Sequence, residues 1–142
     1  MPGPTIVPVN VVVNFNGVSY NPATQQWSGA PVFTVPPSVP VSSGDNTIAW
    51  NLQPAAVPGG FAAQFNATNG IVFDPGWVGG TPTQPNLTTY EAADNFQMAP
   101  GSDPEYYEYS INVSLTSRGN SAVTKSWSYD PDVENEPVIR HC

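Results

Sequence analysis

The acidic residues near the end of the chain carry the most distinctive chemical pattern. Four carboxylates occupy every second position: Asp130, Asp132, Glu134 and Glu136. An extended chain points alternate side chains the same way, so these four are expected on one side. Such a row could supply several of the about six to eight oxygens that Ca²⁺ takes. The alternative is a solvated acidic edge that discourages strand addition by another chain, and the stiffening Pro131 favours this second interpretation.

A second chemical possibility rests on the aromatic residues. Trp77 is flanked by Gly76 and by Gly79–Gly80, a setting in which an indole ring can be exposed and stack on a sugar. Tyr90 and Tyr106 could extend such a platform. The alternative, which the pattern favours, is that Trp77 covers one end of the fold as a lid. Two other tryptophans, Trp50 and Trp127, stand in alternating apolar patterns and are predicted to lie in the core.

Catalytic chemistry has little support. The only histidine and the only cysteine are His141 and Cys142. There is no G-x-S-x-G elbow, phosphate loop or dinucleotide fingerprint. Eleven acidic residues leave a carboxylate-based hydrolase open, but most of them gather in runs typical of a charged surface. We therefore predict a protein without catalytic residues.

Composition and charge indicate which classes of binding partner and which cellular compartment to expect. Three basic residues against eleven acidic ones give a net charge of −8, which repels nucleic acid and anionic membranes. The chain as written shows no signal or membrane segment, and the single Cys142 cannot form an intrachain disulfide. These features predict a cytoplasmic protein, or an exported one if a leader was removed.

The spacing of apolar residues predicts the fold class. With 17 Pro and 12 Gly in 142 residues, we expect one all-β domain over residues 1–142, with about 7–9 strands. The clearest element is a hairpin over 106–129, turning at Gly119 and Asn120 with positive φ. A second hairpin is expected over 39–52. A capping-box pattern, Thr88-Thr89-Tyr90-Glu91, predicts at most one short helix near 88–94.

Two local patterns resemble known families. The run Val39-Pro-Val-Ser-Ser-Gly-Asp-Asn-Thr-Ile-Ala-Trp-Asn resembles the strand, turn and tryptophan of cupredoxin domains. Blue-copper sites need two imidazoles and a thiolate, and His141 and Cys142 lie outside this motif, so no copper site is implied. Asp130-Pro131 and Glu136-Pro137, placed after an aromatic hairpin, resemble the small bacterial DP-EP family, which implies a stand-alone sandwich domain and no catalytic residue.

These patterns together predict a two-sheet antiparallel Greek-key sandwich, either cupredoxin-like or Ig-like. The leading functional hypothesis is a non-enzymatic module for binding or assembly, without a cofactor. The first alternative is a carbohydrate-binding module that uses the aromatics near Trp77. The second is a scaffold stabilised by calcium. A protein or glycan partner is expected, and a homo-oligomer that covers a sheet edge is compatible with the pattern.

Overall fold

The computed structural model describes residues 5–137, which form thirteen strands and no helix. The strands are β1 (Thr5–Asn14), β2 (Ser19–Asn21), β3 (Gln26–Ser28), β4 (Val32–Thr34), β5 (Ser38–Ser42), β6 (Asn46–Ala55), β7 (Phe61–Phe65), β8 (Ile71–Phe73), β9 (Thr83–Asn86), β10 (Thr89–Asp94), β11 (Glu105–Ser117), β12 (Thr124–Tyr129) and β13 (Asp132–Glu136). The prediction of an all-β fold is confirmed.

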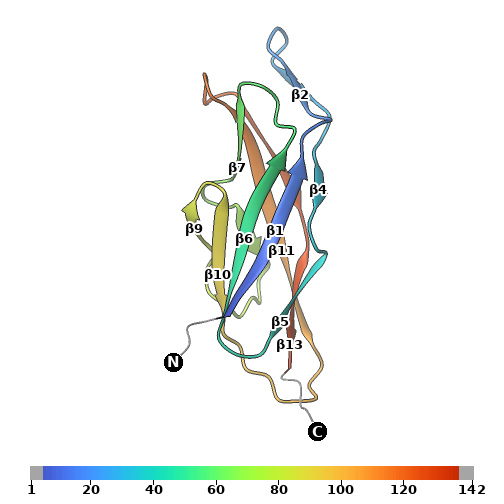
Figure 1. Cartoon of the computed structure of the whole chain (residues 1–142), viewed down its shortest axis with the longest axis vertical. Helices are drawn as coiled ribbons and strands as arrows, with labels where there is room; N and C mark the ends of the chain where they lie inside the picture. The colour runs from blue at the N-terminus through green and yellow to red at the C-terminus, as the bar shows by residue number, and fades with distance from the viewer. Residues whose placement is uncertain (1–4, 138–142) are drawn as a thin grey trace.

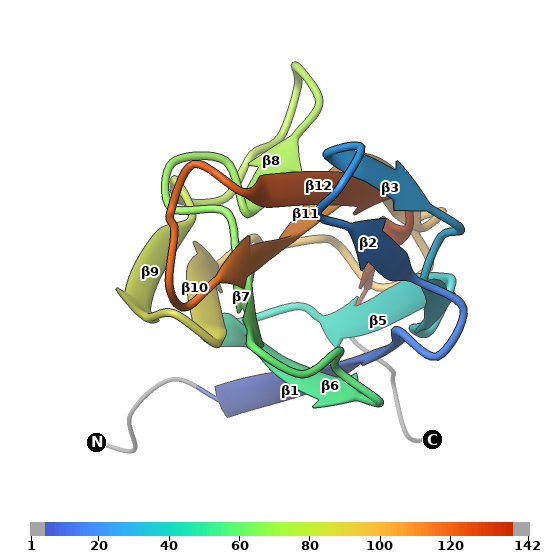
Figure 2. The ribbon, with the colours of Figure 1, turned by 90° about the horizontal axis from the view of Figure 1, so that it is seen from above.

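Two main sheets pack face to face. The first has the order β4-β1-β6-β10-β9, and the second has the order β12-β11-β13-β5, with β7 and β8 also paired to β11. Seen from above, the β1–β6 layer lies across the core from the β11–β12 layer (Figure 2). The strands outnumber the predicted 7–9 because short strands succeed one another along β11: β12 and β13 on one edge, β7 and β8 on the other.

The sheets are mixed, which corrects the antiparallel prediction. Strand β1 runs parallel to β6, and β5 runs parallel to β13. The predicted hairpin over 39–52 is also wrong, because β5 and β6 follow one another in sequence but lie in different sheets. The physical cause is the Pro36-Pro37 segment, which cannot continue the hydrogen-bond ladder of β4. The chain therefore crosses from the first sheet to the second before β5 begins.

Residues 88–94 are not helical. Thr89–Asp94 form β10, which pairs with both β6 and β9. Within β10 the buried residues Tyr90, Ala92 and Asp94 recur at every second position, a strand period that outweighs the local capping-box pattern. The side chain of Asn86 accepts a hydrogen bond from Thr88 N at 3.0 Å, which shapes a turn between β9 and β10.

The long hairpin over 106–129 is confirmed as the antiparallel pair of β11 and β12. Its alternate residues Tyr109, Ile111, Val113 and Leu115 are buried, as their spacing predicts. The turn differs from the prediction, because Gly119 and Asn120 do not have positive φ. Ser117 N donates to Val123 O at 2.9 Å and Val123 N donates to Asn120 O at 3.0 Å. The turn is therefore a longer loop than a tight hairpin turn, and none of its residues has positive φ.

Trp50 joins the two sheets at the centre of the core. It is 0 % exposed, and its Nε1 donates to the hydroxyl of Tyr109 on β11 at 3.0 Å. The hydrogen bond satisfies both polar atoms inside an apolar interior, as burial of Trp and Tyr requires. Trp127 was also predicted to be core, but it is half-buried and packs against the edge of the apolar cluster.

Candidate functional site

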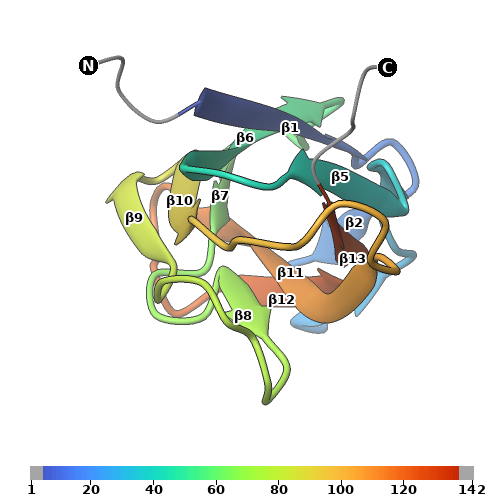
Figure 3. The ribbon, with the colours of Figure 1, turned by 90° about the horizontal axis from the view of Figure 1, so that it is seen from below.

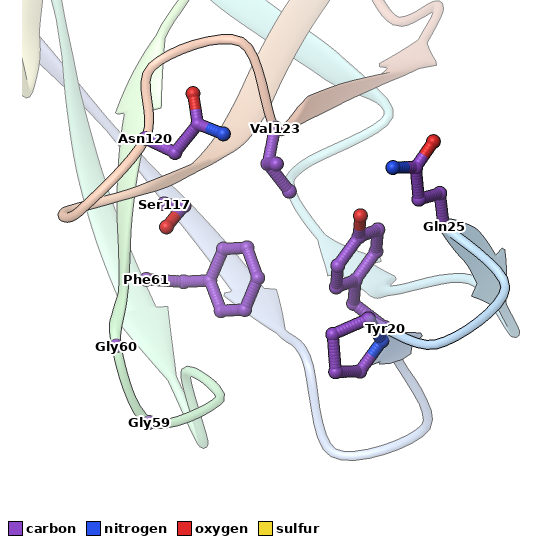
Figure 4. A pocket seen from close by; sticks show the side chains of 9 residues that line it. Tyr20, Gln25, Gly59, Gly60, Phe61, Ser117, Asn120 and Val123 are labelled. Carbon is purple, nitrogen blue, oxygen red and sulfur yellow. The ribbon is translucent and has the colours of Figure 1, made fainter.

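A hollow at one end of the sandwich is a candidate binding site. Three segments meet there: the β2–β3 hairpin, the loop between β6 and β7, and the tip of the β11–β12 hairpin (Figure 1). The hollow has a volume of about 530 Å³, and we call it the loop-end groove (Figure 4). It is lined by Tyr20, Pro22, Gln25, Gly59, Gly60, Phe61, Ser117, Asn120 and Val123.

The β2–β3 hairpin is held in place at its base. Gly29 has φ 77°, and a Cβ added to it would lie 1.8 Å from the carbonyl oxygen of Gly17. Only glycine allows two backbone segments to approach this closely at positive φ. At the tip, Asn21 Oδ1 accepts a hydrogen bond from Ala23 N at 2.9 Å. These two features fix the position of Tyr20 and Gln25 beside the sandwich.

Aromatic rings connect the loop-end groove to the core. Trp27 is the centre of this cluster, with ring centroids 4.9 Å from Tyr20, 5.2 Å from Phe61 and 5.9 Å from Trp127. Trp127 in turn lies 6.0 Å from the buried ring of Phe15. Tilted and edge-to-face contacts at these distances are favourable for aromatic pairs. The rings of Tyr20 and Phe61 are therefore supported from below while they face the groove.

The polar side chains of the groove are neutral. Figure 4 shows the Tyr20 hydroxyl and the amides of Gln25 and Asn120 arranged around the hollow. An amide offers both donors and an acceptor, and a phenol offers one of each. None of the lining residues is an acid, a histidine, a lysine or an arginine. The groove can thus make hydrogen bonds in both directions without charge.

Trp77, the first residue predicted for ligand binding, packs as a lid. Its ring stacks on Phe73 with centroids 3.8 Å apart, and its Nε1 donates to Gly80 O at 3.0 Å. Tyr107 contacts it edge-on at 5.4 Å. A second hollow of about 430 Å³ adjoins Trp77, but the face on Phe73 is covered. The packing favours the lid interpretation.

The other two predicted aromatics do not join Trp77 in a platform. Tyr90 is 3 % exposed, and its hydroxyl accepts a hydrogen bond from Gly70 N at 3.1 Å inside the protein. No ligand can stack on it from solvent, which corrects that part of the prediction. Tyr106 is 60 % exposed, and its hydroxyl donates to Glu134 at 2.7 Å. It is Tyr107, and not Tyr106, that contacts Trp77.

The acidic row keeps its predicted alternation but is not an edge. Strand β13 lies between β11 and β5, so the edge interpretation is wrong. Asp130 accepts a hydrogen bond from Ser110 at 2.8 Å, whereas Glu134 binds Tyr106. Partial burial raises the pKa of Glu136, and a hydrogen bond with Glu134 adds to this. Within residues 5–137 no three His, Cys, Asp or Glu side chains are grouped to hold a metal ion.

Two further predictions fall outside the structure or lack a test. His141 and Cys142 lie outside the described residues. No family model matches the chain, and no curated protein matches it. The resemblance to the DP-EP family therefore stays a prediction. No helix within residues 5–137 is long and apolar enough to cross a membrane.

Sequence reasoning did not find the loop-end groove. Its main residues, Tyr20, Gln25, Phe61 and Asn120, come from three segments that are far apart in sequence. The only local signal was Tyr20 and Trp27 standing close together in a turn-rich stretch. Nothing in the sequence shows that this stretch lies beside the tip of the long hairpin. Only the structure shows that these residues line one groove.

Proposed function

We propose that the protein is a non-catalytic β-sandwich binding module whose loop-end groove holds a neutral, hydroxyl-rich ligand, namely a carbohydrate. The observation that carries this proposal is the pairing of supported aromatic rings, Tyr20 and Phe61, with the neutral amides of Gln25 and Asn120 around one hollow. The proposal keeps the carbohydrate hypothesis of the sequence analysis but moves the site from Trp77 to the opposite end of the sandwich.

The chemistry of the groove suits a sugar ring. A pyranose has apolar C–H faces that can lie on an aromatic ring, whose face carries negative quadrupole charge. Its hydroxyls both donate and accept, as do the amides of Gln25 and Asn120. Ligand sites commonly combine apolar walls with a few convergent polar groups. The uncharged lining disfavours phosphates and other ions, which would lose their hydration without a counter-charge.

Backbone conformation supports a functional role for this end. Among the described residues that are not glycine, only Gln25 and Ala56 have positive φ, at 56° and 53°. Both stand in loops at the groove end. A left-handed conformation is unfavourable for such residues and persists where the surrounding structure imposes it, commonly at binding sites.

Binding, as opposed to catalysis, is supported by what lines the groove. Ser117 is the only aliphatic hydroxyl there, and no acid or base lines the groove beside it. An activated nucleophile requires such a base within hydrogen-bond reach. The fold adds indirect support for a copper-free relative of cupredoxins, because the Val39–Asn51 motif forms β5, a turn and β6 with Trp50 buried.

A glycan array followed by isothermal titration calorimetry tests the proposal. We expect binding to at least one neutral glycan, with affinity lowered at least about 10-fold in Tyr20→Ala and in Asn120→Ala, since each loses a stacking or hydrogen-bonding partner. Tyr106→Ala is the matched control, because it removes an exposed aromatic far from the groove. Trp77→Ala separates the two candidate locations. Silence of the array, or loss of binding only in Trp77→Ala, would refute the groove.

A further inference from the structure

The loop-end groove adjoins a second hollow, which has a volume of about 540 Å³ and which we call the arginine hollow. The two hollows share three lining residues, Gly59, Gly60 and Phe61. A Cβ added to Gly59 or Gly60 would meet no atom within 4 Å beyond the adjacent residues of the chain, so nothing stands over the segment between the hollows. A single ligand can therefore extend from one hollow into the other.

Arg118 gives the arginine hollow its charge. It is exposed and directly follows Ser117, which lines the loop-end groove. Its backbone N donates to Gly60 O at 2.9 Å, and its Nε donates to Phe61 O at 3.5 Å. Both bonds hold Arg118 against the segment that the hollows share. The terminal nitrogens of its guanidinium carry four more N–H donors, and no acid is among the residues that line the hollow.

The loop end is separated from the acidic residues of the chain. The segments that meet there, residues 15–31, 54–65 and 115–124, contain none of the eleven Asp and Glu residues. Strand β13 and the start of β11, which carry several acids, lie at the opposite end, seen from below in Figure 3. Glu105 and Arg118 are roughly 40 Å apart along a strand that rises about 3.3 Å per residue. Salt screens charges over about 10 Å, so an anion at Arg118 meets little repulsion from Glu105.

The remaining walls of the arginine hollow are apolar. They include Pro54, Val57 and Pro58 beside the shared ring of Phe61. Such walls suit the C–H faces of a sugar ring, and the planar guanidinium matches a carboxylate with two parallel hydrogen bonds. One guanidinium balances the single charge of a carboxylate, whereas a phosphate monoester carries about −1.5 to −2 at pH 7. The hollow therefore suits a sugar unit that bears one carboxylate.

We infer that the loop end binds an acidic oligosaccharide, with a neutral sugar unit in the loop-end groove and a uronic acid unit in the arginine hollow, where its carboxylate accepts hydrogen bonds from Arg118. This inference rests on the proposed function and narrows the ligand to a chain of at least two units. It also explains why the groove lining is neutral while a cation stands next to it, since the two hollows take different units.

Glycans that differ only in the carboxylate test the inference. Calorimetry on the full chain compares tetrasaccharides of hyaluronan, unsulfated chondroitin, glucuronoxylan and rhamnogalacturonan with the carboxyl-reduced form of each. We expect at least one acidic form to bind about 10-fold tighter than its reduced form, with an advantage that shrinks in 0.5 M NaCl. Equal binding of the two forms, binding of neutral glycans alone, or equally tight binding of a tetraglutamate peptide would overturn the inference and leave the proposed function standing. Absence of binding to every glycan would refute both.

Variants separate the two hollows. Arg118→Gln should remove the roughly 10-fold advantage of the acidic form and leave binding of the reduced form unchanged, whereas Tyr20→Ala should weaken both forms alike. Lys125→Gln is the matched control, because it removes the same charge from the same hairpin, but Lys125 lies 6.0 Å from the ring centroid of Trp127 and lines neither hollow. It should keep the full advantage.

A measurement on the unsubstituted protein covers the case of a variant that fails to fold. The acidic form should shift the Nε–H resonance of Arg118 in ¹⁵N NMR, and the reduced form should not. An unchanged Arg118 resonance at saturation with the acidic form would overturn the inference.

Discussion

The two ends of the sandwich hold hollows of opposite construction. The loop-end groove is built from short peripheral strands, has neutral lining residues and rests on a stack of aromatic rings. The opposite end, which we call the acid end, is built from the ends of the main strands β10 and β13 and contains the buried carboxyl of Asp94, whose Oδ2 has no hydrogen-bond partner within residues 5–137. The loop-end groove is formed by loops and short strands outside the two main sheets, whereas the hollow at the acid end adjoins buried residues such as Asn135.

Each end contains a feature that lowers the stability of the fold. At the loop end the conflict is in the backbone, since Gln25 is held at positive φ. At the acid end it is electrostatic, since Asp94 is buried with one oxygen unpaired. Natural proteins retain such local conflicts where function needs them. Substitutions that remove either feature should therefore stabilise the fold.

The largest change in stability is expected from adding a side chain at Gly79, near the acid end. A Cβ on Gly79 would lie 2.2 Å from the Trp77 ring and 2.4 Å from the carbonyl oxygen of Ala93. Gly79→Ala would have to displace the Trp77 ring or the β10 backbone, and we expect a loss of about 3 kcal/mol in the free energy of unfolding. Urea denaturation followed by tryptophan fluorescence measures it.

The control for this prediction lies at the loop end. A Cβ on Gly59 meets nothing within 4 Å, so Gly59→Ala should change the unfolding free energy by less than about 0.5 kcal/mol. Equal effects of the two substitutions would show that the close contacts at Gly79 do not restrict a side chain there.

The next effect is a gain of stability in Asp94→Asn. The pKa of Asp94 is raised from 3.8 to about 6 in the folded protein, so the folded state favours the protonated carboxyl. The stability that Asp94 contributes is complete below about pH 3.8 and is lost as pH rises through about 6. A shift of about 2 units corresponds to at most about 3 kcal/mol. Asn is neutral at every pH and can also donate to Asn135 Oδ1.

We therefore expect Asp94→Asn to be about 2 kcal/mol more stable than the parent protein at pH 7.5, with a difference that shrinks towards pH 4. Thermal unfolding from pH 4 to pH 8 measures the trend. Asp130→Asn is the control, since that carboxylate is exposed and bonded to Ser110. A stability difference that does not depend on pH would mean that the carboxyl is not destabilised by its burial.

Much of the fold could be predicted from the sequence because its strands have one buried face. The alternation in β11 is clear at Tyr109, Ile111 and Val113, and all three are buried. Errors arose where distant pairing decided the outcome. Residues 88–94 carry a helix-start pattern, but pairing with β6 and β9 makes them a strand. The Val39–Leu52 segment reads as a hairpin locally, yet its two strands lie in different sheets.

The two sites were less accessible to sequence reasoning. Gln25 and Asn120 are ordinary turn residues in the sequence, and only the fold brings them to one groove. Asp94 ends the 88–94 stretch for which a short helix was predicted, whereas its place in the strand period of β10 makes it inward-facing. Asn135 stands between the acidic residues of the row, and it faces inward together with Val133.

The smallest effect is expected at Gln25, where the conflict is conformational. Glycine adopts φ 56° without steric cost, but it also adds entropy to the unfolded chain. Gln25→Gly should therefore stabilise the protein by only about 0.5 kcal/mol while lowering glycan affinity, because the amide is lost. Ala56→Gly is the matched control: it relieves the same kind of conformation at φ 53° but does not line the groove. It should give a similar gain without changing affinity. If Gln25→Gly instead lowers the free energy of unfolding by more than about 1 kcal/mol in urea denaturation, the positive φ of Gln25 does not destabilise the fold. The contrast with Asp94 would then fail.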